Sequence, residues 1–160
     1  MPQTEITFHS PATEQAPDGA TRIALIGSPN GGKTSIFNQL TGLHAKTGNY
    51  PGVTVSRSEG VARIHDHTFA IEDLPGTYSL SPISPDEQVV VDVLDGRMDQ
   101  VSAPDALVVV ADATALRRSL LLLAEVLPRH LPTAVVVTMT DELRRRQGSL
   151  DVTALSQALG

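Results

Sequence analysis

Residues 27–34 read Gly-Ser-Pro-Asn-Gly-Gly-Lys-Thr and match the phosphate-binding pattern G-x-x-x-x-G-K-[ST]. In this pattern the glycines let backbone N–H groups turn inward around phosphate oxygens. Lys33 is expected to reach the β- and γ-phosphates of a nucleotide, and the Thr34 hydroxyl is expected to ligate Mg²⁺. The predicted nucleotide-binding residues of this loop are Gly27, Asn30, Gly31, Gly32, Lys33, Thr34 and Ser35.

A second group of candidate residues lies downstream, in Asp73-Leu74-Pro75-Gly76. This tetrapeptide ends a predicted strand, so Asp73 can face the same magnesium ion through a water molecule, and Gly76 can offer its N–H to the γ-phosphate. Thr54 lies in a polar segment between the first predicted helix and a predicted hairpin. Its hydroxyl can complete the magnesium shell when a γ-phosphate is present. The predicted magnesium ligands are therefore Thr34, Thr54 and Asp73.

The choice of base is expected to depend on Thr138-Met139-Thr140-Asp141, which follows a predicted strand where GTPases carry N-K-x-D. The Asp141 carboxylate can accept hydrogen bonds from the N1–H and the 2-amino group of guanine, which adenine cannot supply. We therefore favour GTP, bound by Thr138, Met139 and Asp141. Thr138 lacks the amide of the usual Asn, which is expected to weaken guanine affinity. A structural alternative is that Asp141 only caps the next helix.

The hydrophobic pattern predicts a scaffold that places each motif at the end of a strand. Strands alternate with helices, apart from one hairpin. This is typical of an open, mostly parallel sheet with helices on both faces, which binds ligands at the carboxyl ends of its strands. The predicted strands are 21–27, 60–64, 68–73, 106–111 and 133–138, and the predicted helices are 33–40, 87–94, 115–127, 142–146 and 152–159, the last with Asp151 as its N-cap.

Composition narrows the possible functions. The chain has 160 residues, the size of one ordinary domain, with residues 1–20 predicted to be a flexible tail and 21–160 the nucleotide-binding domain. A net charge of −6 argues against nucleic-acid binding, because phosphate backbones would be repelled. The absence of cysteine excludes disulfides and thiolate metal sites. No apolar run approaches the roughly 20 residues needed to span a bilayer.

Three stretches carry a resemblance to a known family: IGSPNGGKTSIFNQLTG, GNYPGVTVSRSEG and DLPGTYSLSPISPDE. From residue 21 to its last residue the chain resembles the N-terminal G domain of the bacterial ferrous-iron transporter FeoB. The resemblance implies a Ras-like P-loop GTPase fold, with Thr54 as the switch I threonine and Asp73 to Gly76 as the start of switch II. It also implies a cytosolic domain at the bacterial inner membrane that regulates Fe²⁺ entry. The implied partner is a membrane permease domain, in the same longer chain or in trans, through which the protein could form oligomers.

The same resemblance implies slow, potassium-stimulated GTP hydrolysis. The implied catalytic residues are Lys33, Asn30, Thr54 and Gly76, with Asn30 as the K⁺ ligand. A cation between the α- and γ-phosphates can neutralise charge in the transition state, as an arginine finger does elsewhere. Thr77 stands where Ras-like enzymes place a water-positioning Gln, so another group must hold the water.

The sequence departs from the family pattern in two ways, and its motifs also fit two other functions. Family members usually carry N-M-x-D and a further strand, whose loop closes over guanine. The chain stops before that strand, so we expect a C-terminally incomplete domain, either a fragment or a degenerate stand-alone copy. One alternative function is a nucleotide-binding module with little turnover. The other is a GTPase of tRNA modification or ribosome assembly, although DLPGTYSL and GNYPGVTV favour the iron transporter.

Two further features receive simple explanations. His65-Asp66-His67 could be an iron site, but a hairpin tip with solvated histidines explains it without a ligand. Arg144 to Arg146 could be a nucleic-acid or lipid patch, but such a short basic run is usually a solvated helix face.

Overall fold

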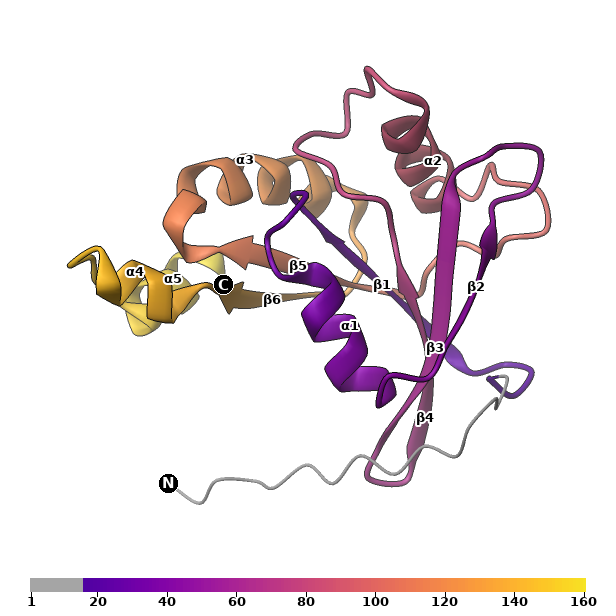
Figure 1. Ribbon diagram of the computed structural model, residues 1–160, viewed down its shortest axis with the longest axis horizontal. Helices are drawn as coiled ribbons and strands as arrows, with labels where there is room; N and C mark the ends of the chain where they lie inside the picture. Colours follow the sequence, from indigo (N-terminus) through magenta and orange to yellow (C-terminus); the bar gives the residue numbers. More distant parts are fainter. Residues whose placement is uncertain (1–15) are drawn as a thin grey trace.

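The computed structural model describes residues 16–160 and is built on a six-stranded sheet with the strand order β2-β3-β4-β1-β5-β6 (Figure 1). Most of the predicted N-terminal tail lies outside the described residues. The strands are β1 (Thr21–Gly27), β2 (Ala45–Asn49), β3 (Ser56–Ile64), β4 (His67–Asp73), β5 (Ala106–Asp112) and β6 (Thr133–Thr138). The α-helices are α1 (Lys33–Thr41), α2 (Pro85–Leu94), α3 (Leu116–Val126), α4 (Thr140–Arg145) and α5 (Val152–Leu159).

The strand pairing confirms the predicted mostly parallel sheet. β1 lies at the centre and pairs in parallel with β4 on one side and with β5 on the other. β6 continues the parallel order beyond β5, whereas β3 runs antiparallel between β2 and β4. The sheet is therefore extended on one side of β1 by the strands β2 to β4 and on the other side by β5 and β6, so the direction of winding reverses at β1. In open α/β sheets such a change leaves a crevice at the carboxyl ends of the strands, where ligands bind.

Alternate residues of β1 enter two separate cores, because neighbouring side chains of a strand point to opposite faces. Leu25 is buried with Phe37 of α1 and Ile71 of β4. Ala24 and Ile26 belong to a larger cluster that contains the apolar residues of α2 and α3. In Figure 1, α1 accordingly lies below the central strand β1, and α2 and α3 lie above it. Helices cover both faces of the sheet, as predicted.

Three details of the predicted scaffold were wrong. Residues 45–49, predicted to be part of a polar loop, form strand β2, and β3 begins at Ser56 rather than at residue 60. Every side chain of β2 is exposed, so this edge strand has no alternation of apolar and polar residues, and it is held by its backbone pairing with β3. Helix α4 begins at Thr140, which places Asp141 inside its first turn. The predicted Asp151 cap is confirmed, since its Oδ1 accepts a hydrogen bond from the Ala154 N–H at 2.9 Å.

The end of α1 packs closely on β3 at Gly60. A Cβ atom at this position would lie 2.5 Å from Thr41 Cγ2 and 2.9 Å from the His44 carbonyl oxygen. We expect Gly60→Ala to lower the free energy of unfolding by about 1–3 kcal/mol, because the buried Thr41 must move. The matched control is Gly48→Ala on β2, where a Cβ would meet no atom within 4 Å. Urea denaturation of both variants would measure the difference, and equal midpoints would contradict the prediction.

Candidate functional site

The loop between β1 and α1 has the backbone shape of an anion site. The Gly31 N–H donates a hydrogen bond to the Ser28 carbonyl at 3.2 Å, and Gly32 has a left-handed φ of 85° as the N-cap of α1. A Cβ at Gly31 would lie 2.8 Å from the Ser28 hydroxyl and 3.2 Å from the Ser28 carbonyl oxygen, so a side chain there would crowd the turn. The first N–H groups of a helix lack intrahelical partners and carry the positive end of its dipole. The loop can therefore hold phosphate oxygens with backbone groups.

Side chains of the phosphate loop and of β4 meet beside this backbone. Lys33 Nζ donates a hydrogen bond to Asp73 Oδ1 within an ion pair, and the Thr34 hydroxyl lies 3.3 Å from Asp73 Oδ2. Only 9% of the Lys33 side chain and 11% of the Asp73 side chain are exposed. The structure thus brings together three residues predicted from the sequence.

The donor atoms at this junction suit the metal that the phosphate-loop pattern implies. Mg²⁺ prefers oxygen ligands and is usually bound through one or two protein groups together with water and substrate phosphates. A carboxylate of Asp73 and a hydroxyl of Thr34 supply such oxygens on one side of the loop. These two residues would therefore hold the ion.

The segment that follows Asp73 lies against the phosphate loop. The Thr77 N–H donates to the Gly27 carbonyl at 2.9 Å, and a Cβ at Gly76 would lie 2.9 Å from the N, Cα and Cγ atoms of Pro29. Gly76 is therefore next to the phosphate loop. Thr77 is fully buried, and its hydroxyl donates to the Ser79 carbonyl at 2.6 Å. The same hydroxyl accepts a hydrogen bond from the Ser79 N–H at 3.3 Å, so it is engaged by the backbone two residues further on.

Two other predicted residues lie exposed on loops. Asn30 is at the tip of the phosphate loop with a φ of 61°. Thr54 lies between β2 and β3, in a segment closed by a hydrogen bond from the Tyr50 N–H to the Val55 carbonyl at 2.9 Å. In Figure 1 this segment lies close to α2 and apart from the turn between β1 and α1. The segment that carries Thr54 therefore lies apart from the phosphate loop in this view, and ligation of the metal at Lys33 and Asp73 would require the segment to move.

The base-binding segment contacts the phosphate loop through Thr138. Its hydroxyl donates to the Gly31 carbonyl at 2.6 Å and lies 3.3 Å from the Ala111 carbonyl. A Cβ at Gly32 would lie 3.3 Å from Thr138 Cγ2 and 3.6 Å from Met139 Cε, so both side chains lie close to the loop. Thr138 lacks the amide of the usual Asn, but its hydroxyl still connects the base-binding segment to the phosphate loop.

We expect Thr138→Val, which has nearly the same shape but no hydroxyl, to leave the part-buried Gly31 carbonyl without this donor. Loss of one such hydrogen bond costs roughly 1–2 kcal/mol, so we expect about tenfold weaker nucleotide binding. Thr138→Ser keeps the hydroxyl and is the control. Equilibrium titration with GDP would test the pair, and equal affinity of Thr138→Val and the wild type would show that the contact does not support the site.

Asp141 projects into solvent from the first turn of α4. Its side chain is 72% exposed, and its Oδ2 accepts a hydrogen bond from Arg145 Nη2 at 2.6 Å. The N-cap of α4 is Met139, so the alternative in which Asp141 caps the helix was wrong. Two hydrogen bonds lower the pKa of the Asp141 carboxyl below its ordinary value, and the one from Arg145 contributes more than the one from the Glu142 N–H. The carboxylate therefore stays ionised at neutral pH, in the form that accepts two hydrogen bonds.

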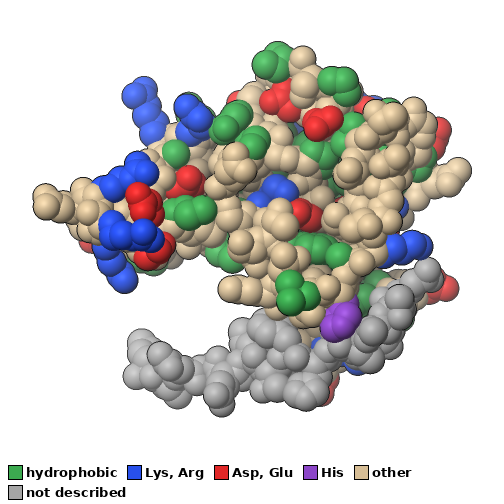
Figure 2. Space-filling view, viewed as in Figure 1, with side chains coloured by type: hydrophobic (Ala, Val, Ile, Leu, Met, Phe, Trp, Pro, Cys, Tyr) green, Lys and Arg blue, Asp and Glu red, His purple; other side chains and the backbone are tan. Residues whose placement is uncertain are grey.

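The other two sequence features lie on the surface, one on α4 and one at a hairpin turn. Arg145 and Arg146 form ion pairs with Asp141 and Glu142, and Figure 2 shows both signs of charge mixed over the end of the molecule where α4 lies. Residues 65–67 are exposed at the turn between β3 and β4. Across residues 16–160, no three His, Cys, Asp or Glu side chains are grouped so that they could hold a metal ion. Across the same range, no helix is long and apolar enough to cross a membrane.

Sequence reasoning missed two carboxylates next to the predicted switch segments. Glu125 of α3 accepts hydrogen bonds from the Ser79 hydroxyl at 3.0 Å and from the Leu80 N–H at 2.6 Å. Glu72 of β4 is buried, although it is charged. Both elements carry other charged or polar residues as well, so the type of these two residues gave no signal. The contacts themselves join residues far apart in the sequence.

Comparison with known proteins gives consistent results. The sequence model of the family described as ferrous iron transport protein B matches residues 21–160. A Porphyromonas gingivalis protein, named as a fusion of Fe(2+) transport protein A and Fe(2+) transporter FeoB, is 43% identical over 148 residues, which cover 92% of this chain and 17% of that protein. This chain therefore spans about a sixth of that relative's length.

Two solved structures of T. maritima FeoB share the fold. The G domain has a TM-score of 0.77 at 39% identity, with 88% of this chain and 83% of that chain covered. The cytosolic domain in a GDP form has a TM-score of 0.79 at 38% identity, with 90% of this chain and 55% of that chain covered.

Proposed function

The chain belongs to the family of ferrous iron transport protein B and has its P-loop GTPase fold, and from this we propose that it binds GTP with Mg²⁺ and hydrolyses it slowly. The observation that carries the proposal is the junction of Lys33, Thr34 and Asp73 beside the phosphate loop. Hydrolysis on this fold depends mainly on positioning the phosphates and on stabilising their charge. The junction supplies a cation and two oxygen donors where both are needed.

Each residue at the junction then has a separate task. Lys33 turns from Asp73 to the β- and γ-phosphate oxygens, which leaves the Asp73 carboxylate to face the metal through a water molecule. The backbone N–H groups of residues 32–35 hold the phosphates, and the Gly76 N–H donates to the γ-phosphate. Thr54 completes the metal shell after its segment moves. When bound, Mg²⁺ supplies charge neutralisation between the phosphates.

Guanine selectivity is proposed to come from Asp141, supported by its exposed, ionised carboxylate and by the Thr138 contact with the phosphate loop. The test is titration of a fluorescent GDP analogue into the purified chain with Mg²⁺, followed by competition with GTP and ATP. We expect competition by GTP and not by ATP. Equal competition by GTP and ATP would contradict the guanine assignment. No binding by a folded chain would contradict the proposed nucleotide binding itself.

Potassium stimulation is proposed with Asn30 as the ligand, because its amide is exposed at the tip of the phosphate loop, where a cation could also contact phosphates. We expect faster GTP hydrolysis in KCl than in NaCl at equal ionic strength, and no difference for Asn30→Ala. Equal rates of the wild type in both salts would contradict this role. Absence of hydrolysis in either salt would favour the alternative of a binding module with little turnover.

For the longer protein, we propose that this domain acts at the cytoplasmic face of the bacterial inner membrane as a nucleotide switch for ferrous-iron transport. The family match supports iron transport over tRNA modification or ribosome assembly. The partner would be a membrane permease domain, and oligomers could form through it. Co-purification of this chain with that permease domain, with GTP or GDP added, would test the coupling.

A further inference from the structure

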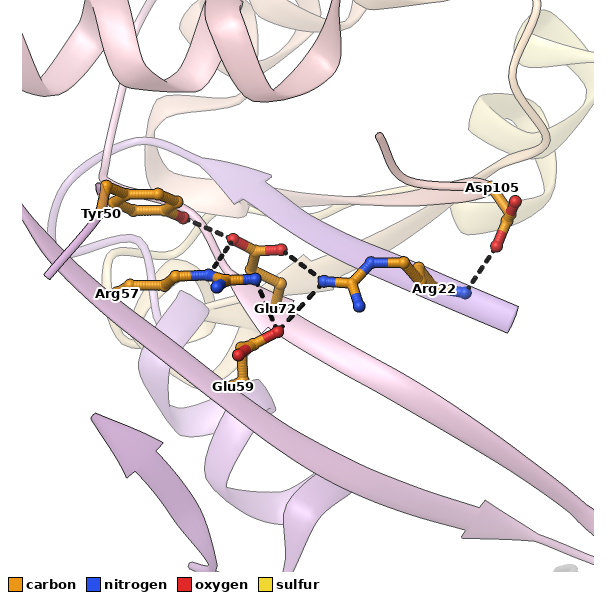
Figure 3. A network of polar contacts seen from close by, with 6 residues as sticks. All are labelled: Arg22, Tyr50, Arg57, Glu59, Glu72 and Asp105. Atoms are coloured by element: carbon orange, nitrogen blue, oxygen red, sulfur yellow. Dashed lines mark hydrogen bonds and ion pairs between the residues drawn. The ribbon is translucent and has the colours of Figure 1, made fainter. Parts of the chain in front are cut away.

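A buried carboxylate on β4 is surrounded by side chains from three other segments (Figure 3). Glu72 is only 4% exposed, and its Oε1 accepts hydrogen bonds from the Tyr50 hydroxyl at 2.8 Å and from Arg57 Nε at 3.1 Å. Its Oε2 accepts a hydrogen bond from Arg22 Nη2 at 3.2 Å. Glu59 joins the group through both arginines, at 3.1 Å from Arg22 and 2.7 Å from Arg57. Two acids and two arginines therefore balance each other, which keeps the buried charge compensated.

These contacts fix both ends of the segment that carries Thr54. Tyr50 stands immediately before residues 51–54, and Arg57 follows shortly after them, yet both side chains donate to the same oxygen of Glu72. Tyr50 is 1% exposed and belongs to the large core cluster together with Val55. Moving the ring out of this core would expose a large apolar surface, so the two ends stay in place while residues 51–54 move.

β4 places Glu72 and Asp73 on opposite faces of the sheet, as successive strand residues are. Glu72 contacts the two ends of the Thr54 segment, and Asp73 contacts Lys33 and Thr34 of the phosphate loop. One dipeptide therefore connects the moving segment to the proposed metal site. This link is short and lies within a paired strand, so it holds a defined geometry.

We propose that Glu72 is a positioning residue for GTP hydrolysis, which anchors the Thr54 segment through Tyr50 and Arg57. The inference rests on the proposed function, in which Thr54 reaches the metal when GTP is bound. A segment tethered at both ends has fewer conformations to lose on ordering, so a larger fraction of molecules holds Thr54 in the productive position. GDP binding, which depends on the phosphate loop, does not require this anchor.

The main test variant is Tyr50→Phe, which keeps the ring in the core and removes only the hydroxyl. We expect its kcat for GTP to fall about tenfold, the change expected from loss of a hydrogen bond to a charged group, with KM and GDP affinity within about twofold of the wild type. Hydrogen exchange of the peptide 50–57 should become at least about threefold faster in the nucleotide-free chain. Glu72→Gln should act in the same direction.

The matched control is Arg22→Gln, which removes the ion pairs of Arg22 with Glu72 Oε2 and with Glu59 but keeps the donors Tyr50 and Arg57 on Glu72 Oε1. We expect it to lower thermal stability without changing kcat or the exchange of peptide 50–57. A stability loss alone would therefore not reproduce the Tyr50→Phe result.

Three outcomes would overturn the inference. Unchanged kcat and exchange in Tyr50→Phe would show that the hydroxyl does not anchor the segment. A raised kcat would mean that the contact holds the segment in an unproductive position, and a parallel loss of GDP affinity would mean a general structural role. If the wild type hydrolyses no GTP, the proposed function has failed. In that case hydrogen exchange tests the inference separately. Mg²⁺ and a non-hydrolysable GTP analogue should slow the exchange of peptide 50–57, and should slow it less in Tyr50→Phe than in the wild type.

Discussion

Replacing Lys33 by alanine is expected to lower the affinity for GDP at least about 100-fold. Truncating one member of a buried, hydrogen-bonded charge pair typically costs 2–5 kcal/mol, and each 1.4 kcal/mol corresponds to a factor of ten. Lys33 is 8% exposed, so water cannot replace its ammonium group beside the phosphates. Isothermal titration with GDP and Mg²⁺ would measure the loss.

The matched control is Lys46→Ala, because Lys46 is exposed on β2 and has no role in the site. Circular dichroism of both variants would establish that they are folded. A loss of affinity that is equal in both variants would contradict the assignment of Lys33.

Asp73→Asn separates the two partners of the ion pair. Lys33 keeps its charge and loses its competitor for phosphate, so GDP should still bind in EDTA, while Mg²⁺ no longer strengthens binding.

The second large effect is expected at Asp141. Asp141→Ala should weaken GDP binding about 100-fold, because two charge-assisted hydrogen bonds to guanine are lost together. Inosine diphosphate lacks the 2-amino group and therefore reports on one of the two bonds. We expect the wild type to prefer GDP to inosine diphosphate, and the variant to bind both equally.

Glu142→Ala is the control for this experiment, since Glu142 follows Asp141 on α4 and pairs with Arg146 outside the base-binding pattern. Competition titrations with the two diphosphates would measure the preference of each variant. If Asp141→Ala still preferred GDP, guanine would be recognised by other groups. If Glu142→Ala lost the preference as well, the effect would be a general change in α4.

The sequence was sufficient for the parts of the site that are contiguous. The phosphate loop is specified by eight neighbouring residues, and the position of Asp73 follows because parallel strands end at the same edge of a sheet. Strand β2 could not be predicted, since all of its side chains are exposed and no hydrophobic pattern marks it. Its existence depends on backbone pairing with β3, which only the folded chain brings about.

The contacts that refine the site also lie beyond local patterns. Thr138 suggested a weakened base site by its type, but its hydroxyl meets Gly31, a residue more than a hundred positions away. Glu72 was indistinguishable in sequence from a solvated strand residue, because its partners come from separate segments. Such contacts depend on which elements become neighbours, and a single sequence contains no direct record of that.

The ion pair between Lys33 and Asp73 has a consequence for the cycle of the domain. Each of these charged groups has the other as its counterion, so the pair leaves no uncompensated charge in the interior. Under the proposed function, an entering phosphate would exchange one counterion of Lys33 for another. Nucleotide binding would then not have to create a new buried charge, and Asp73 would keep compensation only if a cation entered with the nucleotide.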